Sequence, residues 1–277
     1  LFYSARDSWR IHLEGAQKLI ALLHERLESA ELILGNQSGL QDSSLHGYLM
    51  EHCLIYDILS FTRPSSRRSA NTLRFHVLDP SVEAVQFASC PGPLIEVMVL
   101  ALQQNRNLES DGPADLAIKQ RLDAFDPSVW AASIKRLNSK DDFEARTRVG
   151  AAYKTGVTIF TARLSRLTVN NSQMSDLASR IISHLSRIAP EKALFKATCW
   201  PTFVAGAETY DLMERAWVIQ RLHAYFSHFM YANARSAITL LHGIWEAADR
   251  HYATDTIGTE FNWIDEVEKM GADWLFV

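Results

Sequence analysis

The chain has 277 residues and a formal net charge of -4 at pH 7, and its residues are 47% hydrophobic and 22% charged. This composition is ordinary for a soluble globular protein, and the length allows one large domain or two small ones. The negative charge argues against nucleic acid binding by these residues alone, because such binding depends largely on neutralising phosphates.

The chain contains three cysteines, Cys53, Cys90 and Cys199, which lie far apart and form no CxxC pair. Neither a zinc site nor a disulfide scaffold is therefore predicted, and a reducing intracellular compartment fits best. No apolar run reaches the length of about 18 residues that a membrane span requires. Because the chain opens with Leu1 and shows no signal-peptide pattern, we expect an excised fragment with natural neighbours outside it.

A regular apolar stripe predicts a first helix over residues 9–34. Gly35 and Asn36 then tolerate the left-handed conformation that ends a helix. The stripe is also compatible with a coiled-coil seam, but Gly15 and the lack of further heptads favour a packed core helix. The residues of the stripe recur in steps of three and four, which places them on one helix face. They are Trp9, Leu13, Ala16, Ile20, Leu23, Leu27, Ala30 and Leu34.

Residues 43–60 are predicted to form a second helix that Ser43 or Ser44 caps. The basic, serine-rich residues 62–69 then indicate an exposed loop. The functional alternative for this loop is a phosphorylation site at Ser69 or a partner contact, since a phosphate there would pair with the adjacent arginines. Residues 73–78 suit a short strand, although one isolated strand builds no sheet, and a short helix follows to residue 87.

Four helices are predicted in the middle of the chain. Residues 94–105 are apolar nearly all round, which indicates a buried helix, and residues 113–125 form the next, with Asp111 or Asp115 as its cap. A stripe of four apolar residues ending at Ile188 indicates another helix, which Pro190 terminates. Residues 142–167 form a long helix between these, and its predicted inward residues are Val149, Ala152, Tyr153, Val157, Phe160 and Leu164.

The stretch over residues 198–222 combines aromatic and small residues and predicts two helices that join near residues 208–211. Pro201 suits a first helical turn, where its missing N–H has no partner to lose. Gly206 lacks a Cβ and so permits two helix backbones to approach closely. We expect Trp200, Phe203 and Trp217 to face a shared core.

Further helices are expected over residues 221–229, 232–252 and 263–270, and no fixed-period repeat marks a solenoid. The prediction for the whole chain is an all-α fold over residues 1–277, an irregular multi-helix bundle or superhelical array of about eleven helices.

The catalytic motifs that we sought are missing. No GxSxG, GxG or HExxH pattern occurs, so no nucleophile elbow, phosphate cradle or zinc-protease site is predicted. His223 and His228 lie five residues apart and would point to different helix faces, which makes them poor joint metal ligands. No catalytic, metal-binding or cofactor-binding residue is therefore expected in this chain.

Asp141, Asp142 and Glu144 raise one alternative, since paired acids on a helix can hold magnesium for diphosphate chemistry. Arg146 and Arg148 follow at once, however, and no second magnesium motif lies downstream. Acids at a helix start complement its positive dipole end and are explained more simply in that way. A magnesium-dependent prenyl diphosphate enzyme is the less favoured alternative.

Several stretches resemble the fungal-specific transcription factor domain, the regulatory region of zinc-cluster transcription factors, in the second of its two common variants. Two prolines around Cys90 and the replacement of a frequent cysteine by Ala207 depart from the family pattern. The resemblance rests on four motifs in order, which contain Trp9, His12, Leu13, Gly15 and Ala16; Trp200, Pro201, Phe203, Gly206, Glu208 and Arg215; Met230, Asn233, Ala237, Leu241 and Trp245; and Phe261 and Trp263.

This resemblance implies a non-enzymatic regulator in the nucleus. The family's six-cysteine zinc cluster would lie before Leu1 and would bind DNA, and a linker with a coiled coil would make the full-length protein a homodimer. The chain itself would then gate activity by binding a small molecule, a transcriptional co-regulator or the rest of its own protein. A ligand-free helical interaction scaffold is the alternative.

A ligand pocket, if present, is expected among the aromatic helices, because such pockets are mainly apolar with a few polar anchors. The candidate ligand-binding residues are Trp200, Trp217 and Trp245, with Glu208 and Arg215 as polar anchors. The favoured alternative for Glu208 and Arg215 is a structural ion pair that holds two helices together.

Trp200→Ala is expected to lower the free energy of unfolding by roughly 3–5 kcal/mol, as truncation of other buried tryptophans does. Thermal denaturation measures this effect. An unchanged melting temperature would place the indole at the surface and contradict its assignment to the core.

Overall fold

The structure is a computed structural model that describes residues 90–106, 113–133, 140–165, 170–230, 232–254 and 260–270, together with five single residues between 15 and 26. In this part of the chain every regular element is helical, which confirms the predicted all-α class. None of the helices described is long and apolar enough to cross a membrane.

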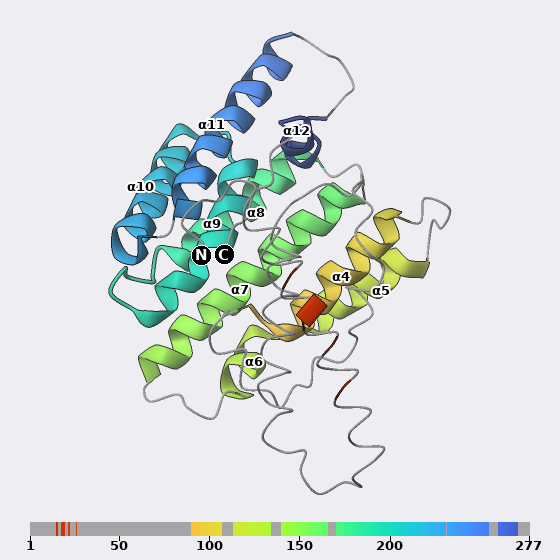
Figure 1. The fold of residues 1–277 in the computed structure, drawn as a ribbon, viewed down its shortest axis with the longest axis vertical. Coiled ribbons are helices and arrows are strands. Elements are labelled where there is room, and N and C mark those ends of the chain that lie inside the picture. The colour runs from red at the N-terminus through yellow and green to blue at the C-terminus, as the bar shows by residue number, and fades with distance from the viewer. Residues whose placement is uncertain are drawn as a thin grey trace, which may run out of the picture.

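The helices follow one another with short connections (Figure 1). In chain order they are α4 (Gly92–Arg106), α5 (Pro113–Ala124), α6 (Pro127–Ser133), α7 (Lys140–Leu164), α8 (Asn171–Leu185), the 3-10 helix η2 (Ala193–Thr198), α9 (Cys199–Glu208), α10 (Leu212–Phe229), α11 (Ala232–Ala253) and α12 (Trp263–Lys269).

The long helix α7 lies at the centre of the described part. It packs against α4 and α6 as well as α8 and α9, and α9 in turn packs against α10 and α11. Figure 1 shows α4 and α5 on one side of α7 and the α9–α11 group on the other. All six residues predicted to face inward from α7 are buried, because their spacing keeps them on one face of the helix.

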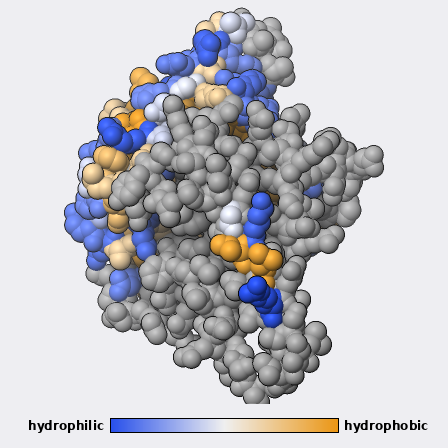
Figure 2. All heavy atoms as spheres, in the orientation of Figure 1, coloured by the Kyte–Doolittle hydropathy of each residue, from blue (hydrophilic) through white to orange (hydrophobic). Residues whose placement is uncertain are grey.

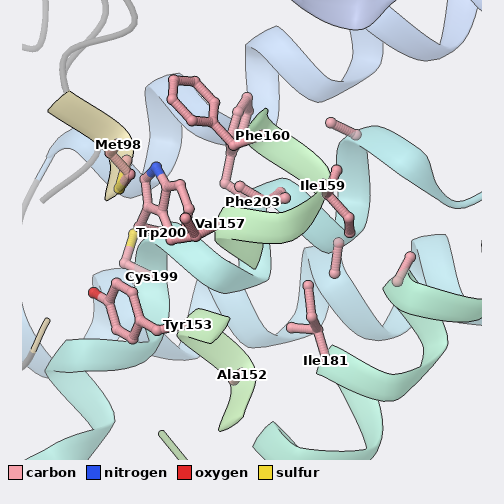
Figure 3. Packing of buried hydrophobic residues seen from close by; sticks show 14 of the residues in the cluster. Met98, Ala152, Tyr153, Val157, Ile159, Phe160, Ile181, Cys199, Trp200 and Phe203 are labelled. Atoms are coloured by element: carbon pink, nitrogen blue, oxygen red, sulfur yellow. The ribbon is translucent and has the colours of Figure 1, made fainter. Parts of the chain in front are cut away.

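The core around Trp200 forms where α9 crosses α7. The indole is 1% exposed and stacks on Tyr153 at 5.5 Å between ring centroids, with Phe160 edge-on at 6.4 Å (Figure 3). A Cβ at Gly156 would lie 2.8 Å from Trp200 Cζ3, so this glycine provides the space for the ring. Trp200 and Phe203 therefore occupy the core as predicted, whereas Trp217 is only half-buried.

Gly206 lies on α9 where α10 and α11 approach it most closely. A Cβ at this position would lie 2.8 Å from Val218 Cγ1 and 3.0 Å from Leu241 Cδ1, and both of these neighbours are fully buried. Gly206 thus leaves space for side chains of two neighbouring helices, while the close approach of two backbones stays a prediction.

Side-chain caps define where several helices begin. Asp211 accepts hydrogen bonds from the backbone N–H groups of Met213 and Glu214 and starts α10. Asn170 caps α8 and Asn262 caps α12 in the same way. These caps satisfy N–H groups that have no partner inside the helix.

Three details differ from the sequence prediction. Residues 221–229 do not form a separate helix but continue α10, since nothing in that stretch breaks a helix. The short helix α6 was not predicted, although Asp126 accepts from the N–H groups of Ser128 and Val129 and Pro127 occupies the first turn. The 3-10 helix η2 was also missed, because its six residues are too few to show a period.

Several predicted elements lie outside the described residues. They are the helices over residues 43–60 and 79–87, the loop over residues 62–69 with Ser69, and the strand over residues 73–78. Of the first predicted helix, only Gly15, Lys18, Leu19, Leu22 and Arg26 are described, and each is helical. The two leucines are exposed, as expected for residues that do not belong to the apolar stripe.

Gly206→Ala is expected to lower the free energy of unfolding by about 1–3 kcal/mol, because the added methyl overpacks a rigid contact. Gly15→Ala is the matched control, since Gly15 is also helical and a Cβ there meets nothing within 4 Å. Both substitutions gain the helix propensity of alanine, about 0.5–1 kcal/mol, so their difference isolates the packing cost. Urea denaturation measures both, and equal unfolding energies would contradict the close approach.

Candidate functional site

A buried ion pair joins the ends of two central helices. Glu208, the last residue of α9, is 1% exposed, and Arg163 near the end of α7 is also buried. Arg163 Nε donates to Glu208 Oε1 at 2.7 Å, and Arg163 Nη2 donates to Glu208 Oε2 at 2.6 Å. This two-point geometry fixes direction as well as distance, because a planar guanidinium matches a carboxylate in only a few orientations.

Trp263 brings a third helix to the same carboxylate. The indole Nε1 of this first residue of α12 donates to Glu208 Oε1 at 2.7 Å, and its ring packs edge-on against Phe203 at 5.8 Å. Three helices that are far apart in the sequence thus meet at one carboxylate. We call Arg163, Glu208 and Trp263 the polar hub.

A second layer of polar side chains surrounds the hub. Arg163 Nη2 also donates to Asn171 Oδ1 at 3.4 Å, and Asn262 Nδ2 donates to the Arg163 carbonyl oxygen at 2.9 Å. Asn171 Nδ2 donates to the Tyr252 hydroxyl at 2.9 Å, and this hydroxyl lies 3.1 Å from that of Tyr210. The layer therefore adds α8 and α11 to the helices that the hub connects.

The electrostatics keep the Arg163 guanidinium charged. Burial acts to lower the pKa of the Arg163 guanidinium, but the hydrogen bonds and the charge of Glu208 outweigh it and raise that pKa above its ordinary value. Burial and the hydrogen bond to Tyr252 raise the pKa of Tyr210, so its hydroxyl stays protonated at neutral pH. A buried charge pair adds little net stability, but loss of one partner leaves the other charge uncompensated.

The ion pair predicted between Glu208 and Arg215 is wrong. Arg215 instead bonds Asp249 of α11 at 3.2 Å, donates to the Thr209 carbonyl oxygen at 3.2 Å and lies over the Trp245 ring at 5.0 Å. The reason is that the backbone becomes extended at Thr209, so that the end of α9 and the start of α10 present their side chains to different neighbours.

The five predicted ligand-binding residues do not all converge. Arg215 and Trp245 lie together, and Trp245 Nε1 donates to the Gly206 carbonyl oxygen at 2.8 Å. Trp200 stacks in the core, Trp217 lies against Arg221, and Glu208 belongs to the hub. Ligand contact by these residues stays a prediction.

Sequence reasoning missed Arg163 and Trp263 as hub residues. A usable signal existed for Arg163, which follows Gly156 and Phe160 at the spacing of the buried face of α7. A charged residue on an apolar stripe is almost never buried unless it is paired. Trp263 gave no comparable signal, because the residues around it in the sequence do not show which carboxylate the indole contacts.

No metal centre is found in the described part of the chain, where no group of three or more His, Cys, Asp or Glu side chains is arranged to hold an ion. His223 and His228 are both exposed. Glu144 bonds Arg148 one helical turn later at 2.6 Å, as expected for surface charges near the start of α7.

Comparison with known proteins identifies the class. The family model described as "Fungal specific transcription factor domain" matches residues 2–277, and the chain belongs to this family. Domains of this family are normally non-catalytic.

A curated relative is the acriflavine sensitivity control protein acr-2 of Neurospora crassa. It is 29% identical over 300 aligned residues, which cover 100% of this chain and 49% of the relative. The chain thus spans about half the length of that protein. No solved structure matches.

Glu208→Leu is expected to lower the free energy of unfolding by about 3–5 kcal/mol, because it leaves Arg163 buried without its partner. The double variant Arg163→Met/Glu208→Leu removes both charges and is expected to be more stable than the Glu208→Leu single variant. Chemical denaturation of the two single variants and the double variant measures the coupling. Additive losses would contradict a coupled pair.

Proposed function

We propose that this chain is the regulatory domain of a zinc-cluster transcription factor that acts in the nucleus and responds to a small molecule or a co-regulator. The observation that carries the proposal is the family match over residues 2–277. The zinc cluster would lie outside residues 1–277 and bind DNA, and the full-length protein would be a homodimer. The chain's share of about half of the Neurospora relative is compatible with such an arrangement.

The polar hub is the proposed point at which the domain's conformation is controlled. It connects α7, α9 and α12 through directional bonds, so a change in the position of any one of these helices breaks contacts of the others. Packed interiors tend to switch between discrete arrangements and resist continuous deformation. An effector shifts such an equilibrium only if it binds the two arrangements with different affinity.

The residues predicted to contact an effector differ in how far they are exposed to solvent. Arg215 and Trp217 are partly exposed and can meet an effector in the arrangement seen here. Trp200 and Glu208 are each 1% exposed and can do so only if α9 separates from its neighbours. Trp245 lies between these groups, since its ring is buried beneath Arg215.

A ligand-free interaction scaffold is the second candidate. It is favoured by one observation, the continuous hydrophobic cluster that extends from α4 to α12. Such a protein would bind co-regulators on its surface and need no interior site.

A small-molecule effector is expected to raise the melting temperature of the purified chain and to change transcription by a reporter fusion. Ligand at one hundred times its dissociation constant adds about 2.7 kcal/mol, which corresponds to a shift of several degrees for a chain of this size. A thermal-shift screen of metabolites finds candidates, and the reporter fuses the chain to an unrelated DNA-binding domain.

Binding without any change in reporter output would contradict regulation by that compound. A reporter that responds to the presence of the chain, but to no compound, would favour the scaffold. A fusion whose output equals that of the unrelated DNA-binding domain alone would contradict a regulatory role for the chain.

A further inference from the structure

Arg221 on α10 is a half-buried arginine held between aromatic rings. Its guanidinium carbon lies 4.6 Å from the ring centroid of Phe195 and 5.2 Å from that of Trp217. Its Nη2 donates to the carbonyl oxygen of Ile188 at 3.2 Å and to Oγ1 of Thr198 at 3.4 Å. Its Nε is enclosed and has no hydrogen-bond partner.

No carboxylate pairs with Arg221 in the described part of the chain. Four other arginines there, Arg121, Arg148, Arg163 and Arg215, each form an ion pair with an acid. Burial lowers the pKa of the Arg221 guanidinium to about 10, which reflects the cost of keeping this charge away from water. An enclosed polar group without a partner is uncommon in folded proteins and calls for an explanation.

The surroundings of Arg221 are positively charged although the whole chain carries a net charge of -4. Arg187 flanks Ile188, and Lys192 precedes η2; both are exposed, and Glu191 is the acid beside them. The sequence contains no Asp or Glu from Arg215 to Trp245 and none over residues 192–207. The connection between α8 and α9 and the adjoining side of α10 therefore form a cationic surface on an acidic protein.

Aromatic groups accompany these charges. Trp217 is half-buried one helical turn before Arg221. Beneath the guanidinium, the buried Phe195 ring stacks on Phe229 and is tilted against His228. Figure 2 shows hydrophobic and hydrophilic surface interspersed along the side of the molecule where α10 and α11 lie in Figure 1. A ligand that fits here has acidic groups and apolar groups close together.

We propose that this surface, which we call the Arg221 surface and which consists of Arg187, Lys192, Trp217 and Arg221, docks an acidic peptide segment of a partner protein. A carboxylate of the segment meets the guanidinium, whose planar fork suits that group, and an apolar side chain next to it packs against Trp217. The partner protein would be the co-regulator of the proposed function, and this proposal rests on that function.

A peptide fits this surface better than nucleic acid. Nucleic acid affinity comes from neutralising many phosphates with exposed cations, and the Arg221 surface offers three, one of which lies between rings. An acidic peptide needs few charges and gains from burial of its apolar side chains. Charge complementarity thus favours the acidic and partly apolar segment.

The test uses the purified 277-residue chain and a fluorescent peptide composed of Asp, Glu, Phe and Leu. Fluorescence anisotropy is expected to show binding that Arg221→Gln weakens about tenfold or more, and that added salt also weakens. The same peptide with Asn and Gln in place of its acids is expected not to bind.

Arg235→Gln is the matched control and is expected to change the affinity less than about twofold. Arg235 is an exposed arginine of α11 that lies over Phe226 at 4.8 Å and pairs with no carboxylate in the described chain. Phe226 follows Arg221 by five positions and so lies on another side of α10. The two variants therefore remove the same charge from different surfaces.

Folding is checked by thermal denaturation of each variant. Arg221→Gln is expected to keep or raise the melting temperature, because it removes a half-buried charge that has no counter-ion among the described residues. Trp217→Ala serves as a second variant, which retains every charge and is expected to weaken peptide binding through loss of the apolar contact.

Four results would overturn the proposal. In the first, Arg221→Gln and Arg235→Gln weaken binding of the acidic peptide equally, and in the second the uncharged peptide binds as tightly as the acidic one. In the third, duplex DNA binds more tightly than the acidic peptide in a manner that depends on Arg221. In the fourth, the chain self-associates and Arg221→Gln abolishes this self-association. The reporter experiment does not use this peptide. If the chain regulates the reporter but does not bind the acidic peptide, the docking surface alone is refuted. If the output of the fusion equals that of the unrelated DNA-binding domain alone, the proposed function is refuted.

Discussion

The arrangement of the described helices depends on the buried pair of Arg163 and Glu208. A buried ion pair permits few alternative packings of the helices that carry it. A packing that separates the two charged groups leaves both of them without solvent and without a counter-charge. The pair therefore specifies where the end of α9 must lie relative to α7. Trp263 extends this specification to α12 through a bond to the same carboxylate. We infer that the hub contributes more to the uniqueness of the fold than to its net stability.

Apolar packing determines how closely the helices approach, and the hub determines their alignment. Gly156 and Gly206 lack the Cβ atoms that would collide with Trp200 and with Val218. Buried side chains fill the space that each missing Cβ leaves, so the helices cannot slide without opening the core. A domain built in this way suits regulation, since it changes between discrete arrangements and does not yield gradually.

The arginines of the described chain serve two different roles. Arg163 has its counter-ion in the interior and acts in folding, whereas Arg221 is enclosed by aromatic rings and has no carboxylate partner in the described residues. In the proposed complex, a carboxylate of the acidic peptide would supply the partner that Arg221 lacks in the described residues. Arg163 thus aligns helices within the fold, and Arg221 is the arginine that we propose for recognition.

The sequence by itself determined the all-α class, the family and most helix positions within the described residues, because each rests on local spacing. Apolar periodicity placed α7 and its inward face, and the small Gly206 predicted a close helix contact, where side chains of two neighbouring helices fill the space that the missing Cβ leaves. Which acid pairs with which base was decided only by the tertiary structure, and Glu208 was assigned to Arg215 when its partner is Arg163. Helical spacing shows that a side chain points inward, but the partner that it meets depends on how distant helices are packed.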